Sequence, residues 1–180
     1  MTIDSMEVNW QPKNMKHLIF FSIVLVHLTA FSQSEVSCWD GDCLKNGWTW
    51  LNYQSGSKTD LACYRDGCEK SGWIGLSSNS QRYYTSCKEG ACFKNGWYRI
   101  DQATQNVVHN VVCRSADSVS TEADCLKYGW VIYGTHGQEA VMSCFYQDCR
   151  NEGWLIQTSY GLMRATCKHG GCWTEGWIEN

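Results

Sequence analysis

The sequence contains six copies of one short motif, in which two cysteines are followed by a glycine and a tryptophan. The unit is C-x4-C-x3-G-W, and successive first cysteines are 25, 24, 26, 31 and 23 residues apart. The spacing of 31 arises because eleven residues, 114–124, separate the two cysteines of the fourth unit. A recurring period of this length indicates a repeat architecture, in which a single unit is too small to bury a core. Neighbouring units must therefore stack or pair edge to edge.

Each Gly-Trp opens a short run of β-branched and aromatic residues, such as "WTWLNY" and "WVIYG", which is typical of a strand. A turn cluster such as "QSGSK" follows, and a second extended run leads into the next cysteine. The sequence predicts an all-β fold, a tandem array of about six short β-hairpin repeats stapled by disulfides. The last unit stops at "GWIEN" without a return strand. This unit would then either cap the end of the array or simply lack that strand. The recurrent glycine indicates a backbone angle or a space that no side chain permits.

All twelve cysteines lie after residue 33, and an even number in an exported chain indicates a disulfide framework. Two pairings are open. A four-residue loop such as "WDGD" can bring two Cα atoms to the roughly 5.5 Å that a disulfide needs, and the insertion in the fourth unit is tolerated most easily by a local pair. Chain entropy instead favours bridges between units, at about 3.5 against about 2 kcal/mol. We expect pairing within units: Cys38–Cys43, Cys63–Cys68, Cys87–Cys92, Cys113–Cys125, Cys144–Cys149 and Cys167–Cys172.

Zinc is the alternative role for such cysteines. Structural zinc ligands usually stand two to four residues apart, four to each ion, and export into an oxidising compartment disfavours free thiolates. A catalytic dithiol needs one special pair rather than six equivalent ones. We therefore expect no metal site and no cofactor.

The first apolar segment, 18–31, follows Lys16 and His17 and precedes the polar stretch "SQSEVSC". This arrangement is typical of a signal peptide cleaved before Gln33. A membrane anchor would need about 20 apolar residues, and this run is shorter. Residues 1–14 do not fit a signal peptide, so Met15 is an alternative start. We expect residues 1–32 to form an N-terminal extension and signal peptide, and residues 33–180 to form a single cysteine-rich β-hairpin repeat domain. The mature chain, without a membrane span, would be secreted, periplasmic or at the cell surface.

The first two units carry a resemblance to a known family. Tyr64-Arg65-Asp66-Gly67 resembles the aromatic and turn element of MORN-type repeats, Gly72 their later glycine, and residues 55–58 their hairpin turn. Cysteines stand here at positions that the family leaves polar, and a tryptophan follows the glycine. The resemblance implies a twisted meander of hairpins that is used for contact with a protein or a membrane surface.

The tryptophans suggest where binding occurs. The six motif tryptophans recur at the same place in each unit and are expected to form a core stripe, the alternative being a row of exposed platforms for sugars or peptides. Trp39, Trp50 and Trp173 do not recur, and are therefore the candidates for surface contact and binding.

No catalytic constellation is present in the sequence. The histidines after the signal segment, His109, His136 and His169, stand in different units, and His109 in "VVHNVV" is expected to face solvent. A phosphate-binding loop, a zinc-protease motif and a nucleophile elbow are absent from the sequence, and the net charge of −3 gives no footprint for nucleic acid. We expect an exported, non-enzymatic repeat protein that binds a protein or glycan outside the cell. The alternative is a small secreted effector or inhibitor that displays the loop 114–124.

Overall fold

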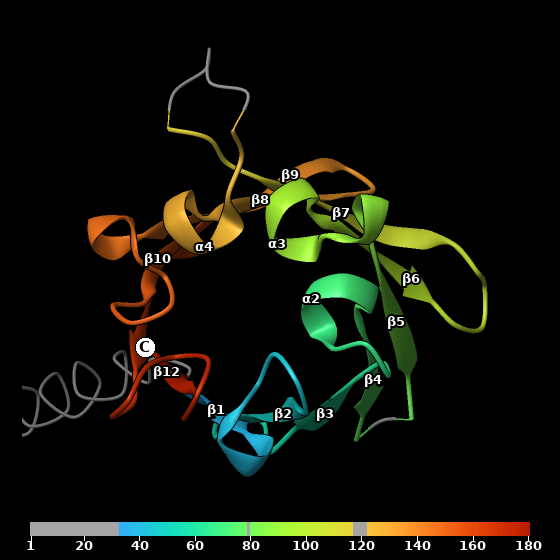
Figure 1. The fold of residues 1–180 in the computed structure, drawn as a ribbon. Helices are drawn as coiled ribbons and strands as arrows, with labels where there is room; N and C mark the ends of the chain where they lie inside the picture. Colours follow the sequence, from blue (N-terminus) through green and yellow to red (C-terminus); the bar gives the residue numbers. More distant parts are fainter. Residues whose placement is uncertain (1–32, 79, 117–121) are drawn as a thin grey trace, which may run out of the picture. The chain divides into compact units, whose positions relative to one another are not determined.

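A computed structural model of the chain describes residues 33–78, 80–116 and 122–180. The predicted signal peptide and the alternative start at Met15 lie outside these residues. The described residues form twelve strands in one closed antiparallel barrel, seen in Figure 1 from the end that carries the short helical turns. Within the same ranges, no helix is long and apolar enough to cross a membrane.

Every strand pairs with its neighbours in the sequence, and β12 pairs with β1. The strands are β1 (Ser34–Cys38), β2 (Gly47–Asn52), β3 (Lys58–Cys63), β4 (Trp73–Ser77), β5 (Arg82–Cys87), β6 (Trp97–Asp101), β7 (Val107–Cys113), β8 (Trp130–Gly134), β9 (Gly137–Cys144), β10 (Trp154–Thr158), β11 (Gly161–Cys167) and β12 (Trp177–Glu179). The helical turns are η3 (Trp39–Gly41), α2 (Cys68–Ser71), η4 (Lys88–Gly90), α3 (Cys92–Asn95), α4 (Cys125–Tyr128) and η5 (Phe145–Gln147).

The two cysteines of each unit form a disulfide with one another, so the predicted local pairing is confirmed. Their Cα atoms lie 4.4 to 4.8 Å apart. We call each C-x4-C segment, with the longer one of the fourth unit, a knuckle. Asp40, Glu89 and Tyr146 take left-handed backbone angles inside their knuckles, and this reverses the chain within four residues. The described residues of all six knuckles lie at the same end of the barrel, and the described residues of the hairpin turns lie at the other.

The spacing of the cysteine and the glycine in C-x3-G follows from a single helical turn. In five of the six units the glycine amide donates a hydrogen bond to the carbonyl oxygen of the second cysteine, as in Gly96 to Cys92 at 2.8 Å. The six motif glycines have φ angles between 84° and 112°. A Cβ atom at any of them would collide with a backbone carbonyl oxygen of the neighbouring strand. The glycine therefore supplies both the backbone angle and the space that the sequence indicated.

The closure of the barrel corrects the expectation that the last unit either caps the array or lacks its return strand. The last unit obtains its return strand from β1, in a register that pairs Ser34 with Glu179 and Glu35 with Ile178. At the knuckle end, the Cys43 amide donates to the Trp173 carbonyl oxygen at 2.9 Å and joins the first unit to the last. Closure satisfies the edges that an open array would leave unpaired, which is its physical advantage.

The motif tryptophans, Trp48, Trp73, Trp97, Trp130, Trp154 and Trp177, are buried inside the barrel next to the knuckles, so the core interpretation is confirmed. Consecutive indoles lie 4.9 to 6.1 Å apart between ring centroids from Trp48 to Trp177. Trp173 contacts both ends of this series, at 6.2 and 5.4 Å, and Phe93 packs on Trp173 at 5.2 Å. Side chains just fill a barrel of about eight strands, so twelve strands need rings of this size to close one end.

Candidate functional site

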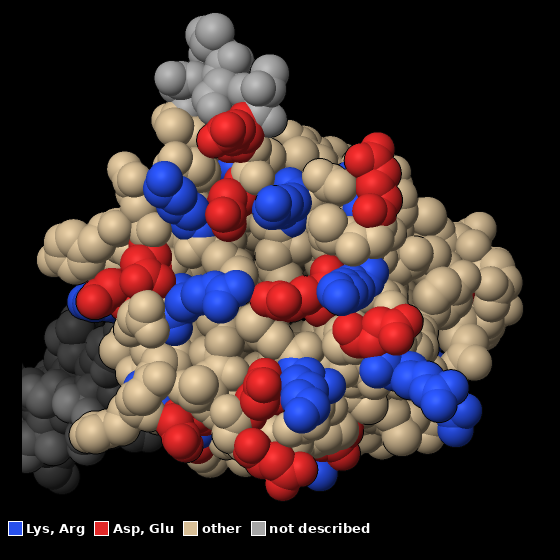
Figure 2. Space-filling view, viewed as in Figure 1, with Lys and Arg blue, Asp and Glu red and all other residues tan. Residues whose placement is uncertain are grey.

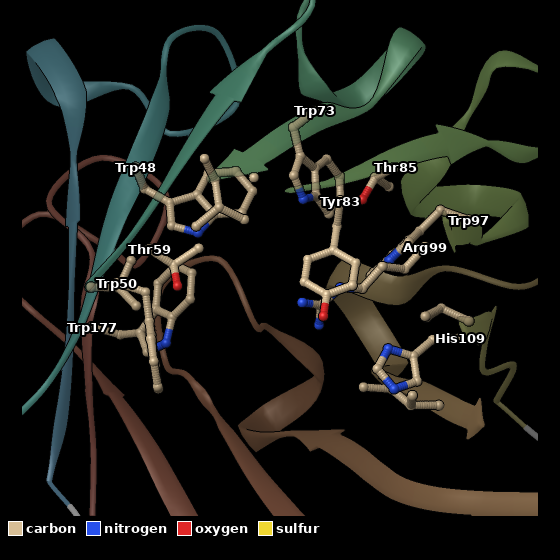
Figure 3. A pocket seen from close by; sticks show the side chains of 15 residues that line it. Trp48, Trp50, Thr59, Trp73, Tyr83, Thr85, Trp97, Arg99, His109 and Trp177 are labelled. Carbon is tan, nitrogen blue, oxygen red and sulfur yellow. The ribbon is translucent and has the colours of Figure 1, made fainter. Parts of the chain in front are cut away.

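Beyond the ring of motif tryptophans, the barrel encloses a cavity of about 500 Å³. It is lined by Val36, Trp48, Trp50, Thr59, Leu61, Trp73, Gly75, Tyr83, Thr85, Trp97, Arg99, His109, Val111, Ile132 and Trp177. A largely aromatic and apolar wall with a few polar groups, at this volume, is typical of a site for a small ligand. Figure 3 shows the lining side chains projecting into the barrel from its strands.

The cavity exists because the repeats differ at one inward position. Side chains alternate along a strand, so the residue two places after each motif tryptophan also faces inward. These residues are Trp50, Gly75, Arg99, Ile132, Ile156 and Glu179. Gly75 places no side chain there, and a Cβ atom added to it would make only ordinary contacts, at 3.9 Å, with Leu61 and Thr59. The missing side chain on β4 leaves space between the Trp50 and Arg99 positions of the neighbouring hairpins.

One wall of the cavity is held by a carboxylate. The indole nitrogen of Trp177 donates to Glu179 Oε1 at 3.0 Å, and that of Trp50 donates to Glu179 Oε2 at 3.3 Å. Two tryptophans on different strands are therefore tied to a single acceptor. This arrangement fixes the rings that β2 and β12 contribute to the cavity (Figure 3).

The opposite wall carries positive charge. In the closed order of twelve strands, β6 lies six places from β12, so Arg99 faces the Trp177 wall across the barrel. The Arg99 guanidinium lies 4.0 Å from the centroid of the Tyr83 ring, and Arg99 is paired across strands with His109. Figure 3 shows Tyr83, Arg99 and His109 grouped on this side of the cavity.

His109 is neutral more readily than an ordinary histidine. Burial lowers the pKa of its imidazole and the charge of Arg99 lowers it further, whereas Glu139 acts in the opposite direction. His109 Nε2 lies 3.1 Å from Glu139 Oε2. Burial also lowers the pKa of the Arg99 guanidinium. Among the described residues, no salt bridge joins Arg99 to a carboxylate.

The cavity faces the end with the hairpin turns. The motif tryptophans at the knuckle side are 2 to 8% exposed, whereas Trp50, Thr59, Tyr83 and His109, nearer the turns, are only half-buried. Exposure thus rises along the strands from the ring of indoles toward the turns. A ligand would enter there and meet the indoles as the floor.

A second hollow, of about 600 Å³, lies at the knuckle end. Charged side chains of both signs line this hollow and pair with one another, as Arg150 does with Glu69 at 3.1 Å. Figure 2 shows acidic and basic side chains interspersed over this face. The interior cavity is the better candidate, since it combines aromatic surface with an unpaired cation.

The residues predicted to bind lie in three different places. Trp50 lines the cavity. Trp39 stands on the first knuckle, and its indole nitrogen donates to Thr49 Oγ1 at 3.0 Å. Trp173 is 9% exposed and packs on the tryptophan ring, so the expectation of a surface position is wrong for it. Its size serves to fill the wide end of the barrel.

The prediction that His109 faces solvent is also wrong. Cys113 and Val111 point into the barrel, and His109, two residues before Val111, shares their face. Arg99, Tyr83 and Glu179 were not singled out from the sequence. Counting in steps of two from each motif tryptophan and each first cysteine would have placed all of them inside.

The loop of the fourth unit is structured at its described ends. Ser115 and Ala123 form an isolated bridge, and the Asp124 side chain accepts hydrogen bonds from the amides of Leu126 and Lys127 at the start of α4. Asp124 therefore caps a helical turn. Among the described residues, no group of three or more histidine, cysteine, aspartate or glutamate side chains could hold a metal ion.

Comparisons with protein-family models, with curated proteins and with solved structures find no match to the chain. The resemblance to MORN-type repeats therefore has no support from a family match. The hairpin meander that the resemblance implied is present, but it is closed into a disulfide-rich barrel.

Proposed function

We propose that the chain is an exported, non-enzymatic module that binds the end of a glycan chain in the barrel cavity. The observation that carries this proposal is the pairing of fixed indole rings with a few polar groups inside a cavity of about 500 Å³. Sugar rings present apolar C–H faces that stack on indoles and hydroxyl groups that need hydrogen-bond partners. The cavity offers both, through Trp50 and Trp177 on one side and Thr59, Thr85 and Arg99 on others.

The cavity favours a glycan over a folded protein as the partner. A protein surface could touch only the rim, because the aromatic rings lie inside the barrel, whereas one or two sugar units fit the enclosed volume. Export agrees with the six disulfides, which indicate an oxidising environment.

The absence of catalysis is part of the proposal, and the state of the nearby carboxylates supports it. Glu179 accepts two indole N–H groups, and Glu139 pairs with His109. Hydrolysis of a glycosidic bond normally needs two carboxyl groups that flank the bond. Glu179 is hydrogen-bonded to the indoles of one wall of the cavity, and Glu139 pairs with His109 on the other wall.

Tryptophan fluorescence and calorimetry test the proposal on the exported protein with its disulfides intact. The probes are methyl glycosides of glucose, galactose, mannose and N-acetylglucosamine, together with glucuronate. We expect at least one probe to bind, and Gly75→Leu to abolish that binding by filling the cavity. Gly75→Ala is the matched control and retains binding, since its Cβ makes only ordinary contacts. Equal binding by Gly75→Leu and the wild type, or no binding by any probe, would contradict the proposal.

A further inference from the structure

Arg99 is the starting point, because a cation on the wall of an apolar cavity is costly without a partner. Removing a charge from water is unfavourable unless an opposite charge or hydrogen bonds compensate it. In the described part of the chain, the guanidinium stacks on the ring of Tyr83, 4.0 Å from the ring centroid. The face of a tyrosine ring attracts a cation weakly and leaves the five N–H donors without acceptors.

Asp101, on the same strand as Arg99, and Glu139, beside His109, both have partners other than Arg99. Asp101, two residues along β6, accepts hydrogen bonds from the amides of Thr104 and Ala103 at 2.8 and 3.0 Å, and these bonds lower the pKa of its carboxyl group. Glu139 pairs with His109 at 3.1 Å. Asp101 is therefore held within its own hairpin, and Glu139 on β9 is held by His109 on β7. Within the described residues, no carboxylate forms a salt bridge with Arg99.

We propose that the sugar taken by the cavity is acidic, a hexuronic acid at the end of a glycan, and that Arg99 binds its carboxylate. This inference rests on the proposed function, since it names the class of sugar that the same cavity selects. The guanidinium matches a carboxylate with two parallel hydrogen bonds, which adds direction as well as attraction. A sugar ring between the two walls then has its carboxylate at Arg99 and a C–H face toward Trp50 and Trp177.

Glu179 gives the ligand a single orientation. It lies on β12, six strands from β6, and holds the two indoles of the opposite wall. An anionic group is repelled from that wall and attracted to Arg99. The two charges therefore exclude the reversed pose, and the neutral atoms of the sugar face the indoles.

The test compares glucuronate, glucose and glucose 6-sulfate as probes in calorimetry. For the wild type we expect glucuronate to bind about 10- to 100-fold more tightly than glucose, which corresponds to one charge-assisted pair. Arg99→Gln should remove this preference, so that glucuronate and glucose bind with equal affinity. A melting temperature close to that of the wild type shows that the variant is folded. Arg99→Lys should restore only part of the preference, because ammonium cannot form the paired bonds.

The possible outcomes separate this inference from the proposed function. If glucose and glucuronate bind equally to the wild type, or if Arg99→Gln keeps the preference, the acidic-sugar assignment is overturned while glycan binding stands. If glucose 6-sulfate binds as tightly as glucuronate, recognition of a carboxylate is overturned. If Gly75→Leu binds both sugars like the wild type, the cavity itself is not the site, and the proposed function fails.

Discussion

The carbonyl oxygen of Val36 lies against Gly176 so closely that no Cβ atom fits between them. The φ angle of Gly176 is 98°, which an L-residue with a side chain rarely adopts. Gly176 is also the point where the last unit meets β1, so the closure of the barrel depends on this contact.

Gly176→Ala should therefore lower the free energy of unfolding by about 3 kcal/mol, from backbone strain together with overpacking. Denaturant unfolding with intact disulfides measures it. Gly75→Ala is the control, expected within about 1 kcal/mol of the wild type because its Cβ has room. Similar losses in the two variants would contradict the role of the motif glycine.

The disulfides should contribute in proportion to the loops that they close. The sequence separation is 5 for Cys38–Cys43 and 12 for Cys113–Cys125. Chain entropy predicts that replacing the first pair by alanine costs about 2 kcal/mol and replacing the second about 3 kcal/mol. Denaturant midpoints of the two double variants give the comparison, and the mass of the protein before and after reduction with alkylation counts the bridges. A larger loss for the shorter loop would argue against this account.

Stability should fall in acid through Glu35. Its carboxylate on β1 accepts hydrogen bonds from Lys168, at 2.6 Å, and from Tyr53, and these lower its pKa below the ordinary value of 4.5. The unfolded chain then takes up a proton before the folded chain does, so the stabilisation is present above the ordinary pKa and is lost as the pH falls through the folded pKa. Melting temperatures between about pH 7 and pH 3 should fall less steeply in Glu35→Gln than in the wild type. Parallel curves would show that Glu35 does not contribute.

Binding of glucuronate should strengthen as the pH falls. His109 lies beside Arg99 and Glu139, and its pKa is lowered by burial and by the Arg99 charge. A bound carboxylate favours the imidazolium form, so binding raises that pKa and takes up a proton. Calorimetry at about pH 7.5 and pH 5.5 should show the higher affinity at the lower value. His109→Gln should be insensitive to this change, and a pH effect of the same size in that variant would exclude His109 as its source.

The loop 114–124 should be dispensable for the cavity. Replacing it with the four residues 39–42 of the first knuckle keeps an aspartate directly before the second cysteine. Asp42 accepts a hydrogen bond from the Lys45 amide at 3.0 Å, and Asp124 accepts one from the Leu126 amide in the same way. We expect the melting temperature and the binding of sugar probes to stay close to those of the wild type. Loss of binding with an intact fold would favour the alternative in which the loop carries the activity.

The repeat made most of the local structure predictable. C-x4-C, C-x3-G and the strand that begins at each tryptophan are short-range features, so the knuckles, the local disulfides and the hairpins follow from the spacing. Closure was not predictable in the same way, since it joins β1 to β12, and no local pattern in "GWIEN" shows which strand will pair with it. The end of an open array and the last seam of a barrel have the same sequence signature.

The site was less predictable because it is built from the differences between units. Arg99, Tyr83 and His109 do not belong to a common motif. They come together only because their strands curve around one cavity. That these side chains point inward could be predicted from the sequence, by counting in steps of two from Trp97 to Arg99 or from Cys113 to His109. The width of the cavity could not be predicted, because the diameter of a barrel depends on the number of its strands.

The seam between β1 and β12 also imposes an order on folding. The two cysteines of each disulfide are 5 residues apart in five units and 12 apart in the fourth, so every knuckle can oxidise as soon as its own unit has been made. The pairing of Ser34 with Glu179 has the longest sequence separation in the sheet and must await the last residues of the chain. Until then the first strand has an open edge and the tryptophans of the growing sheet lack their final neighbour. A chain shortened by its last strand would keep its disulfides and yet expose that edge to other molecules.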